Sequence, residues 1–136
     1  MKYLLDTNVC IRFLSGRNQN ILKMFQVTAP KERVIPSVVR GELYYGASKS
    51  NRKDETLQNL EIFFNIHPHL DFDNEAAKIY GEIRALLEQK GKPIGPYDLQ
   101  IAAISIVNNL ILVTHNVDEF SRISGLSIQD WEKAEL

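Results

Sequence analysis

The chain lacks long apolar runs, and it has a single cysteine. Its first apolar stretch, Tyr3 to Leu5, ends at Asp6 and is far too short for a signal peptide or a membrane span. The lone Cys10 cannot form an internal disulfide, and it lies among apolar residues where a small buried thiol packs well. The sequence therefore predicts a protein of the reducing cytoplasm with no membrane partner.

An excess of charge of either sign is also lacking. Sixteen Lys and Arg face 17 Asp and Glu, so the formal net charge is −1. Proteins that simply coat RNA usually carry a basic excess, and this balance argues against that class. It does not exclude an enzyme that acts on nucleic acid, because carboxylates that bind a metal ion are neutralised by it.

Repeats, low-complexity stretches and Gly/Ser-rich linkers are absent as well, so we expect one domain over residues 1–136. Short apolar segments alternate with amphipathic ones. They predict strands at Tyr3–Leu5, Arg33–Ile35, Leu110–Thr114 and Leu126–Ile128, and helices at Thr7–Leu14, Asn20–Val27, Ser37–Tyr45, Asp54–Phe64, Glu75–Gln89, from Pro96 onward, and in a turn at Asp118–Phe120. This alternation indicates an α/β fold with a mainly parallel sheet that helices cover on both faces.

In such a fold the functional crevice lies at the carboxyl ends of the strands. Asp6 and Asn116 each come just after an apolar strand, so both are expected there. Asp6 has a second interpretation, as the N-cap of the helix that begins at Thr7. The other carboxylates decide between the two.

Two more carboxylates have suggestive positions. Glu42 lies at the border of the apolar stripe of its helix, although a solvated surface glutamate explains that position as well. Asp98 lies in the first turn of a helix that begins at Pro96 and then runs without charge through residues 99–107. A carboxylate that heads a buried helix needs a partner, and a cation is the obvious one.

The three carboxylates come from separate segments, and no cysteine or histidine cluster lies beside them in the sequence. This set of ligands favours a binding site for a hard cation such as Mg²⁺ or Mn²⁺. Such an ion binds phosphate oxygens and activates water, so the substrate expected from this donor set is a phosphodiester.

Four segments, read with their neighbours, resemble the PIN-domain ribonucleases and specifically the VapC toxins of type II toxin–antitoxin pairs. They are Leu5-Asp6-Thr7-Asn8, Arg40-Gly41-Glu42-Leu43 with Gly46-Ala47, Gly95-Pro96-Tyr97-Asp98 with Ile101-Ala102-Ala103, and Thr114-His115-Asn116 with Glu119-Phe120. They occur in the family's order and span nearly the whole chain.

The resemblance implies a PIN-like α/β fold and an Mg²⁺-dependent endoribonuclease, with Mn²⁺ as a substitute, in which Asp6, Glu42 and Asp98 are catalytic and hold the metal. The products carry a 5′-phosphate and a 3′-hydroxyl. The family also implies a homodimer, inhibition by a VapB-like antitoxin in a higher assembly, and contact with operator DNA only through that antitoxin. The Gly-Pro-Tyr-Asp form of the third motif is similar to the branch that cuts tRNA in the anticodon region, initiator tRNA among its targets.

One departure from the family pattern concerns the fourth acidic position. Many PIN domains have an aspartate where this chain has Asn116, and Glu119 or Asp118 is expected to supply the missing charge. A group of surrounding residues is expected to orient the carboxylates or to contact substrate: Thr7, Asn8, Thr114, Asn116 and Glu119.

Lysine, histidine and tyrosine side chains near the motifs have less specific positions. Lys90 and Lys92, in the loop that leads to Asp98, are candidates for binding RNA phosphates. His67 and His69 are expected on the surface or in an edge strand, and alternation at the strand end is expected to turn His115 away from the crevice. Core or dimer packing explains Tyr45 better than base stacking does.

Two competing classes remain open on the sequence. One is an inactive PIN scaffold that only binds an antitoxin or RNA. The other is a receiver-like regulatory domain or phosphatase with Asp6 as phosphoacceptor, but both want an acidic neighbour where Thr7 and Asn8 stand.

Overall fold

Four short strands form a parallel sheet in the order β2-β1-β3-β4 in the computed structural model, which describes residues 1–133. The strands are β1 (Tyr3–Leu5), β2 (Arg33–Val34), β3 (Ile111–Val113) and β4 (Ile128–Gln129). Leu4 of β1 is paired with Val34 on one side and Leu112 on the other, and all three are fully buried. Apolar residues are expected where helices cover both faces of a sheet.

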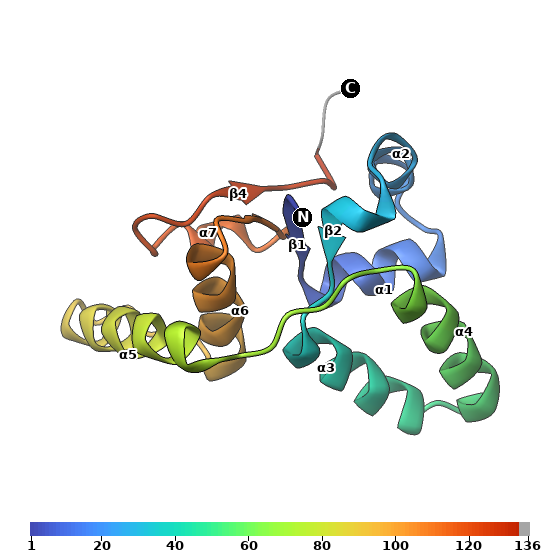
Figure 1. Cartoon of the computed structure of the whole chain (residues 1–136), viewed down its shortest axis with the longest axis horizontal. Coiled ribbons are helices and arrows are strands. Elements are labelled where there is room, and N and C mark those ends of the chain that lie inside the picture. Colours follow the sequence, from blue (N-terminus) through green and yellow to red (C-terminus); the bar gives the residue numbers. More distant parts are fainter. Residues whose placement is uncertain (134–136) are drawn as a thin grey trace.

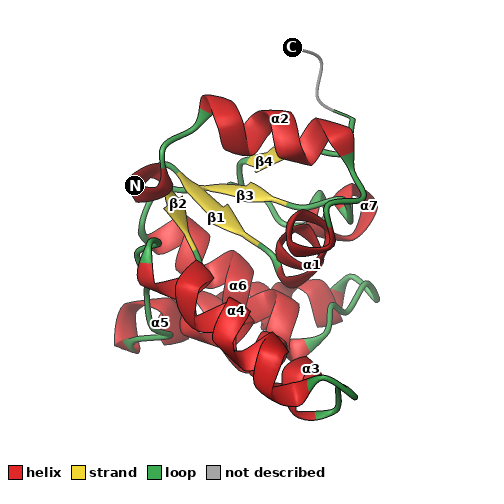
Figure 2. Ribbon diagram, turned by 90° about the vertical axis from the view of Figure 1, so that its right-hand side faces the viewer, coloured by secondary structure: helices red, strands yellow, loops and turns green. Residues whose placement is uncertain are grey.

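Seven α-helices and one 3₁₀ turn surround the sheet (Figure 1). Their bounds are α1 (Thr7–Ser15), α2 (Gln19–Val27), η1 (Pro30–Glu32), α3 (Ser37–Ser48), α4 (Lys53–Asn65), α5 (Asn74–Gln89), α6 (Pro96–Val107) and α7 (Val117–Phe120). In the view of Figure 2, α2 lies above the sheet and α3 to α6 lie below it. Helices therefore cover both faces, and the predicted α/β architecture is confirmed.

The element types match the predicted ones, and the boundaries differ by a few residues. Helix α3 continues to Ser48, beyond the predicted end at Tyr45, because Ala47 is still buried against the core. Strand β2 ends at Val34 because the Ile35 N–H donates to the Pro68 carbonyl instead of to a neighbouring strand. No helix within residues 1–133 is long and apolar enough to cross a membrane.

Helix α6 is the central helix, as its charge-free sequence predicts. Its run from Ile101 to Ser105 is fully buried, and the helix packs against both α5 and β3. Burial of each large apolar side chain contributes about 1.5–3 kcal/mol. Asp98 is thus mounted on a rigid element with little freedom to shift.

The prediction for His67 is wrong, because this side chain is buried. Its Nδ1–H donates to the Phe63 carbonyl at 2.7 Å, and its Nε2 accepts a hydrogen bond from Arg33 Nε at 3.2 Å. Burial, with the nearby positive charge of Arg33, lowers the pKa of the imidazole. His67 is therefore a neutral core residue that links α4 to β2.

Candidate active site

Asp6 lies at the carboxyl end of β1, where it is only 8% exposed. Its Oδ1 accepts a hydrogen bond from the Val9 N–H at 2.9 Å and so caps α1. Burial raises the pKa of Asp6, and the hydrogen bonds from Thr114 and Val9 oppose that shift. Asp6 therefore has both predicted roles: it caps α1, and it places a carboxylate at the carboxyl end of β1.

Asp98 lies in the first turn of α6, directly after the N-terminal pair Pro96-Tyr97. Burial raises its pKa to about 7, helped by the negative charge of Glu119 and a hydrogen bond with it. The charges of Asp6 and Glu42 act in the same direction. This carboxyl group therefore binds a proton more readily than an isolated aspartate, which is ionised near neutral pH.

Glu42, partly buried on α3, completes the set. Its charge acts on both Asp6 and Asp98, so the structure brings the three predicted carboxylates near one another. Of the two candidates for the fourth acidic position, Glu119 is the neighbour of Asp98, whereas Asp118 is exposed. Asn116 Nδ2 donates to Glu119 Oε2 at 2.6 Å and holds that carboxylate in place.

The surrounding residues divide into two groups. Thr114 hydrogen-bonds to Asp6 and also accepts from the Asn116 N–H at 3.0 Å. Thr7 Oγ1 is buried, and it has no hydrogen-bond partner within the described residues. Asn8, in contrast, is exposed and lines a shallow cleft on α1 with Arg12, outside the carboxylate cluster.

Lys90 and Lys92 are exposed in the loop between α5 and α6. The Lys92 N–H donates to the Leu87 carbonyl, which fastens the loop to the end of α5. The loop ends at Gly95, directly before the helix that carries Asp98. Their role in RNA binding stays a prediction.

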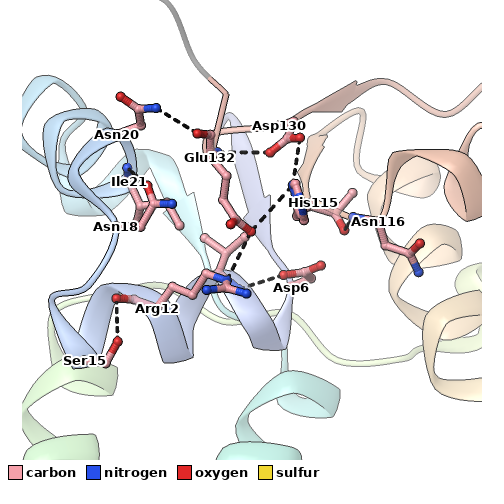
Figure 3. Close-up of polar contacts among 12 residues, drawn as sticks. Asp6, Arg12, Ser15, Asn18, Asn20, Ile21, His115, Asn116, Asp130 and Glu132 are labelled. Carbon is pink, nitrogen blue, oxygen red and sulfur yellow. Dashed lines mark hydrogen bonds and ion pairs between the residues drawn. The ribbon is translucent and has the colours of Figure 1, made fainter.

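A second polar cluster, which we call the β4 cluster, adjoins Asp6 and consists of Arg12, His115, Asp130 and Glu132. Figure 3 shows the Glu132 side chain reaching between Arg12 and His115 toward Asp6. Arg12 Nε lies 3.2 Å from Glu132 Oε2, and His115 Nδ1 lies 3.0 Å from Asp130 Oδ2. The charge of Glu132 also contributes to the raised pKa of Asp6.

The sequence interpretation missed Asp130 and Glu132. Both follow the last strand, β4, so the rule that singled out Asp6 would have found them too. His115 turns toward these two carboxylates and not toward Asp98, which agrees with the expectation that it avoids the main cluster.

The main cluster fits a hard divalent cation. Asp6, Glu42 and Asp98 offer only carboxylate oxygens, the ligands that Mg²⁺ and Mn²⁺ prefer. Burial raises the pKa of Asp98, the neighbouring carboxylates add to that shift, and none of Asp6, Glu42 and Asp98 forms an ion pair within residues 1–133. Thr7, the residue after Asp6, has a buried hydroxyl without a hydrogen-bond partner within the described residues, and buried polar atoms usually have one.

Comparison with known proteins agrees with this geometry. Residues 3–126 match the model of the PIN domain family. The chain is 39% identical to Ribonuclease VapC2 of Rickettsia felis over 98% of its own length and all of that protein. It is 40% identical to the tRNA(fMet)-specific endonuclease VapC of Salmonella typhimurium over 96% of its length and 98% of that protein.

Solved structures show the same relationship. The crystal structure of DNA-bound VapBC from Salmonella typhimurium superposes with a TM-score of 0.90 at 40% identity, covering 96% of this chain and 98% of that one. VapBC2 from Rickettsia felis, bound to a DNA fragment from its promoter, superposes with a TM-score of 0.86 at 36% identity over 96% and 99% of the two chains.

Proposed function

This chain belongs to the PIN-domain family, in the branch of the VapC ribonucleases, and from that premise we propose that Asp6, Glu42 and Asp98 are its catalytic residues. As a VapC ribonuclease it is the toxin of a toxin–antitoxin pair. The observation that carries the residue assignment is the grouping of these carboxylates: burial and Glu119 raise the pKa of Asp98 most, and the charges of Asp6 and Glu42 also reach it. The match to the PIN domain family argues against the alternative of a phosphoacceptor receiver domain.

The same three carboxylates hold Mg²⁺ in our proposal, and Mn²⁺ substitutes for it. A divalent ion bound there neutralises charge on a phosphodiester and lowers the pKa of water. Glu119 adds a fourth carboxyl group beside Asp98, in place of the aspartate that Asn116 replaces. One metal is all that the proposal requires.

The chain's own residues prepare this arrangement. The hydrogen bonds from Val9 and Thr114 orient the Asp6 carboxylate, so it needs no reorganisation when a ligand binds. Asp98 and Glu119 would hold a cation only after losing the proton of their shared hydrogen bond, because ligation needs ionised carboxylates. RNA is then cut by in-line attack of water, which leaves a 5′-phosphate and a 3′-hydroxyl.

For the substrate we propose tRNA, with initiator tRNA cut in the anticodon region as the leading candidate. Relatives at 39–40% identity from Shigella flexneri and Salmonella typhimurium are named tRNA(fMet)-specific endonucleases, and the Gly-Pro-Tyr-Asp motif is present here. The exposed Lys90 and Lys92 are proposed to bind its phosphates.

For the partners we propose a homodimer that a VapB-like antitoxin inhibits. Three of the similar solved structures, at 32–40% identity, are VapBC complexes, and two of these three are bound to DNA. Operator DNA is proposed to reach this protein only through the antitoxin, which agrees with a net charge of −1.

The test is cleavage of purified total tRNA in Mg²⁺ and in EDTA, with the ends mapped by sequencing. We expect cuts at one position in one tRNA, absent in EDTA and in Asp98→Asn. Asp118→Asn is the matched control, because it removes an exposed carboxylate on the same helix as Glu119 and should leave cleavage intact. If the folded, antitoxin-free protein cuts no tRNA, rRNA or mRNA, the chain is an inactive scaffold.

A further inference from the structure

We propose that a cleft between α3 and α6 binds one unpaired base of the RNA, stacked on Tyr45 and Tyr97. The inference rests on the proposed ribonuclease function and adds a substrate-binding subsite to it. The cleft has a volume of about 540 Å³, and Glu42 and Gln100 line it together with the two tyrosines. That volume lies within the usual range of about 300–1,000 Å³ for small-ligand sites.

The two tyrosine rings are unusually open to solvent. Tyr45 is 65% exposed and Tyr97 61% exposed, whereas Phe63 and Phe64 are each 4% exposed in the core. The sequence favoured core or dimer packing for Tyr45, and its side chain does not lie in the core of this structure. Two large exposed aromatic side chains lining one cleft indicate a ligand or partner surface.

The cleft adjoins the carboxylates directly. Glu42 lines it and lies one helical turn before Tyr45 on α3. Tyr97 immediately precedes Asp98 at the start of α6. A nucleotide that flanks the phosphate bound at the carboxylates is therefore within reach of both rings.

The chemistry of the lining suits a base. Aromatic rings stack on any base, and unpaired bases are the parts of RNA that proteins read most readily. The Gln100 amide offers a donor and an acceptor for a base edge. Lys49 Nζ lies 4.9 Å from the centroid of the Tyr45 ring and provides positive charge for a phosphate beside the cleft.

A second copy of the chain fits the cleft less well. A stable protein interface covers about 800 Å² on each partner. The proposed catalytic Glu42 lines the same cleft as Tyr45 and Tyr97, so an interface centred on the two rings would have to include it. We therefore assign the cleft to RNA and treat the second copy as an outcome of the test.

The first experiment measures steady-state cleavage of the tRNA substrate by Tyr45→Ala, Tyr97→Ala and the corresponding phenylalanine variants. Loss of stacking should raise KM about tenfold, equivalent to about 1.4 kcal/mol, and change kcat less than about twofold. Phenylalanine should restore KM, because the ring is what binds. Ile62→Ala is the control, since Ile62 is 66% exposed in a different cleft, between α1 and α4.

The second experiment separates binding from chemistry. In an Asp98→Asn background, a single-stranded RNA with 2-aminopurine beside the cleavage site should lose fluorescence on binding. The quenching should persist in Tyr97→Phe and disappear in Tyr97→Ala. Sedimentation velocity of every variant at one concentration reports the oligomeric state.

The outcomes distinguish the two proposals. If the wild type cuts RNA and the alanine variants have the wild-type KM and fluorescence quenching, the proposed stacking site is wrong. The proposed ribonuclease function is then unaffected. If the alanine variants dissociate into smaller species, the cleft is an interface between copies. If wild type cuts no RNA, the proposed function fails and the stacking site fails with it.

Discussion

The two sides of the crevice use the same kind of residue in opposite ways. On the α6–α7 side, Asp98 and Glu119 lie together, and neither forms an ion pair within residues 1–133. In the β4 cluster, Asp130 and Glu132 are paired with His115 and Arg12 at 3.0 and 3.2 Å. The α6–α7 side has no basic partner within residues 1–133, whereas in the β4 cluster Arg12 offsets the charge of Glu132 and His115 contacts Asp130.

This difference separates a site for an external cation from a structural contact. The ligand atoms of His115, Asp130 and Glu132 lie within 4.8 Å of one another and resemble a metal site in geometry alone. The Arg12 guanidinium already offsets the charge of Glu132, so a metal would have to displace it. By geometry alone, either side could be a metal site. The charge balance favours the α6–α7 side as the metal site.

The largest expected effect is on catalysis. Asp98→Asn should lower kcat on the RNA substrate by roughly 10²–10³-fold, the usual loss when one group that stabilises transition-state charge is removed. Asp130→Asn, the matched change in the β4 cluster, should alter kcat by less than about threefold on the same reasoning. Equal losses in both variants, measured on folded protein, would remove the distinction between the two sides.

The next effect is stabilisation by metal. At 100 times its dissociation constant, Mg²⁺ should stabilise the fold by about 2.7 kcal/mol, seen as a higher thermal midpoint. The shift should vanish in Asp98→Asn and persist in Asp130→Asn, with Ca²⁺ and EDTA as comparisons. A wild-type midpoint that does not move at saturating Mg²⁺ or Mn²⁺ would contradict the metal assignment.

The fold was largely predictable because its elements have strong local patterns. The charge-free run after Asp98 predicts a buried helix, and the apolar stretches before Asp6 and Asn116 predict parallel strands. Element ends were less predictable, since tertiary contacts decide them. The buried Ala47, which extends α3, is one example.

The site was predictable only in part. Asp6, Glu42 and Asp98 were expected to converge, from strand-end position and from the family motifs. Glu119 was expected as one of two candidates for the fourth acidic position, but its direct contact with Asp98 depends on how α7 is placed against α6. The β4 cluster was missed although its carboxylates follow a strand, and the pairing of β4 with β3 brings residues 130 and 132 beside His115.

A third effect concerns pH in the absence of metal. The folded-state pKa of Asp98, about 7, is raised above the ordinary aspartate value of 3.8. A raised carboxyl pKa means that the folded state binds the proton more tightly, so this contribution to stability is present at low pH and is lost as pH rises through about 7. In EDTA the free energy of unfolding from urea titrations should therefore decline between about pH 4 and 7 relative to Asp98→Asn.

The slope should be modest, because Asp98 is only half buried and solvent screens its neighbours. Mg²⁺ should reverse the trend. The ion competes with the proton, so its affinity should fall as pH drops below about 7. Identical pH profiles for wild type and Asp98→Asn would mean that the raised pKa contributes nothing to stability.

The smallest effect is expected from breaking the β4 cluster. Arg12 is 48% exposed and Glu132 12% exposed in their side chains, so water screens one end of the pair. A double-mutant cycle of Arg12→Ala and Glu132→Gln should give a coupling of about 0.2–1 kcal/mol that shrinks at high salt. The Mg²⁺-induced rise in thermal midpoint should be kept in Arg12→Ala, because Arg12 neutralises Glu132 and lies outside the proposed ligand set. If Arg12→Ala abolished that rise instead, the two sides of the crevice would act as one site, and the division of labour argued from their charge balance would be wrong.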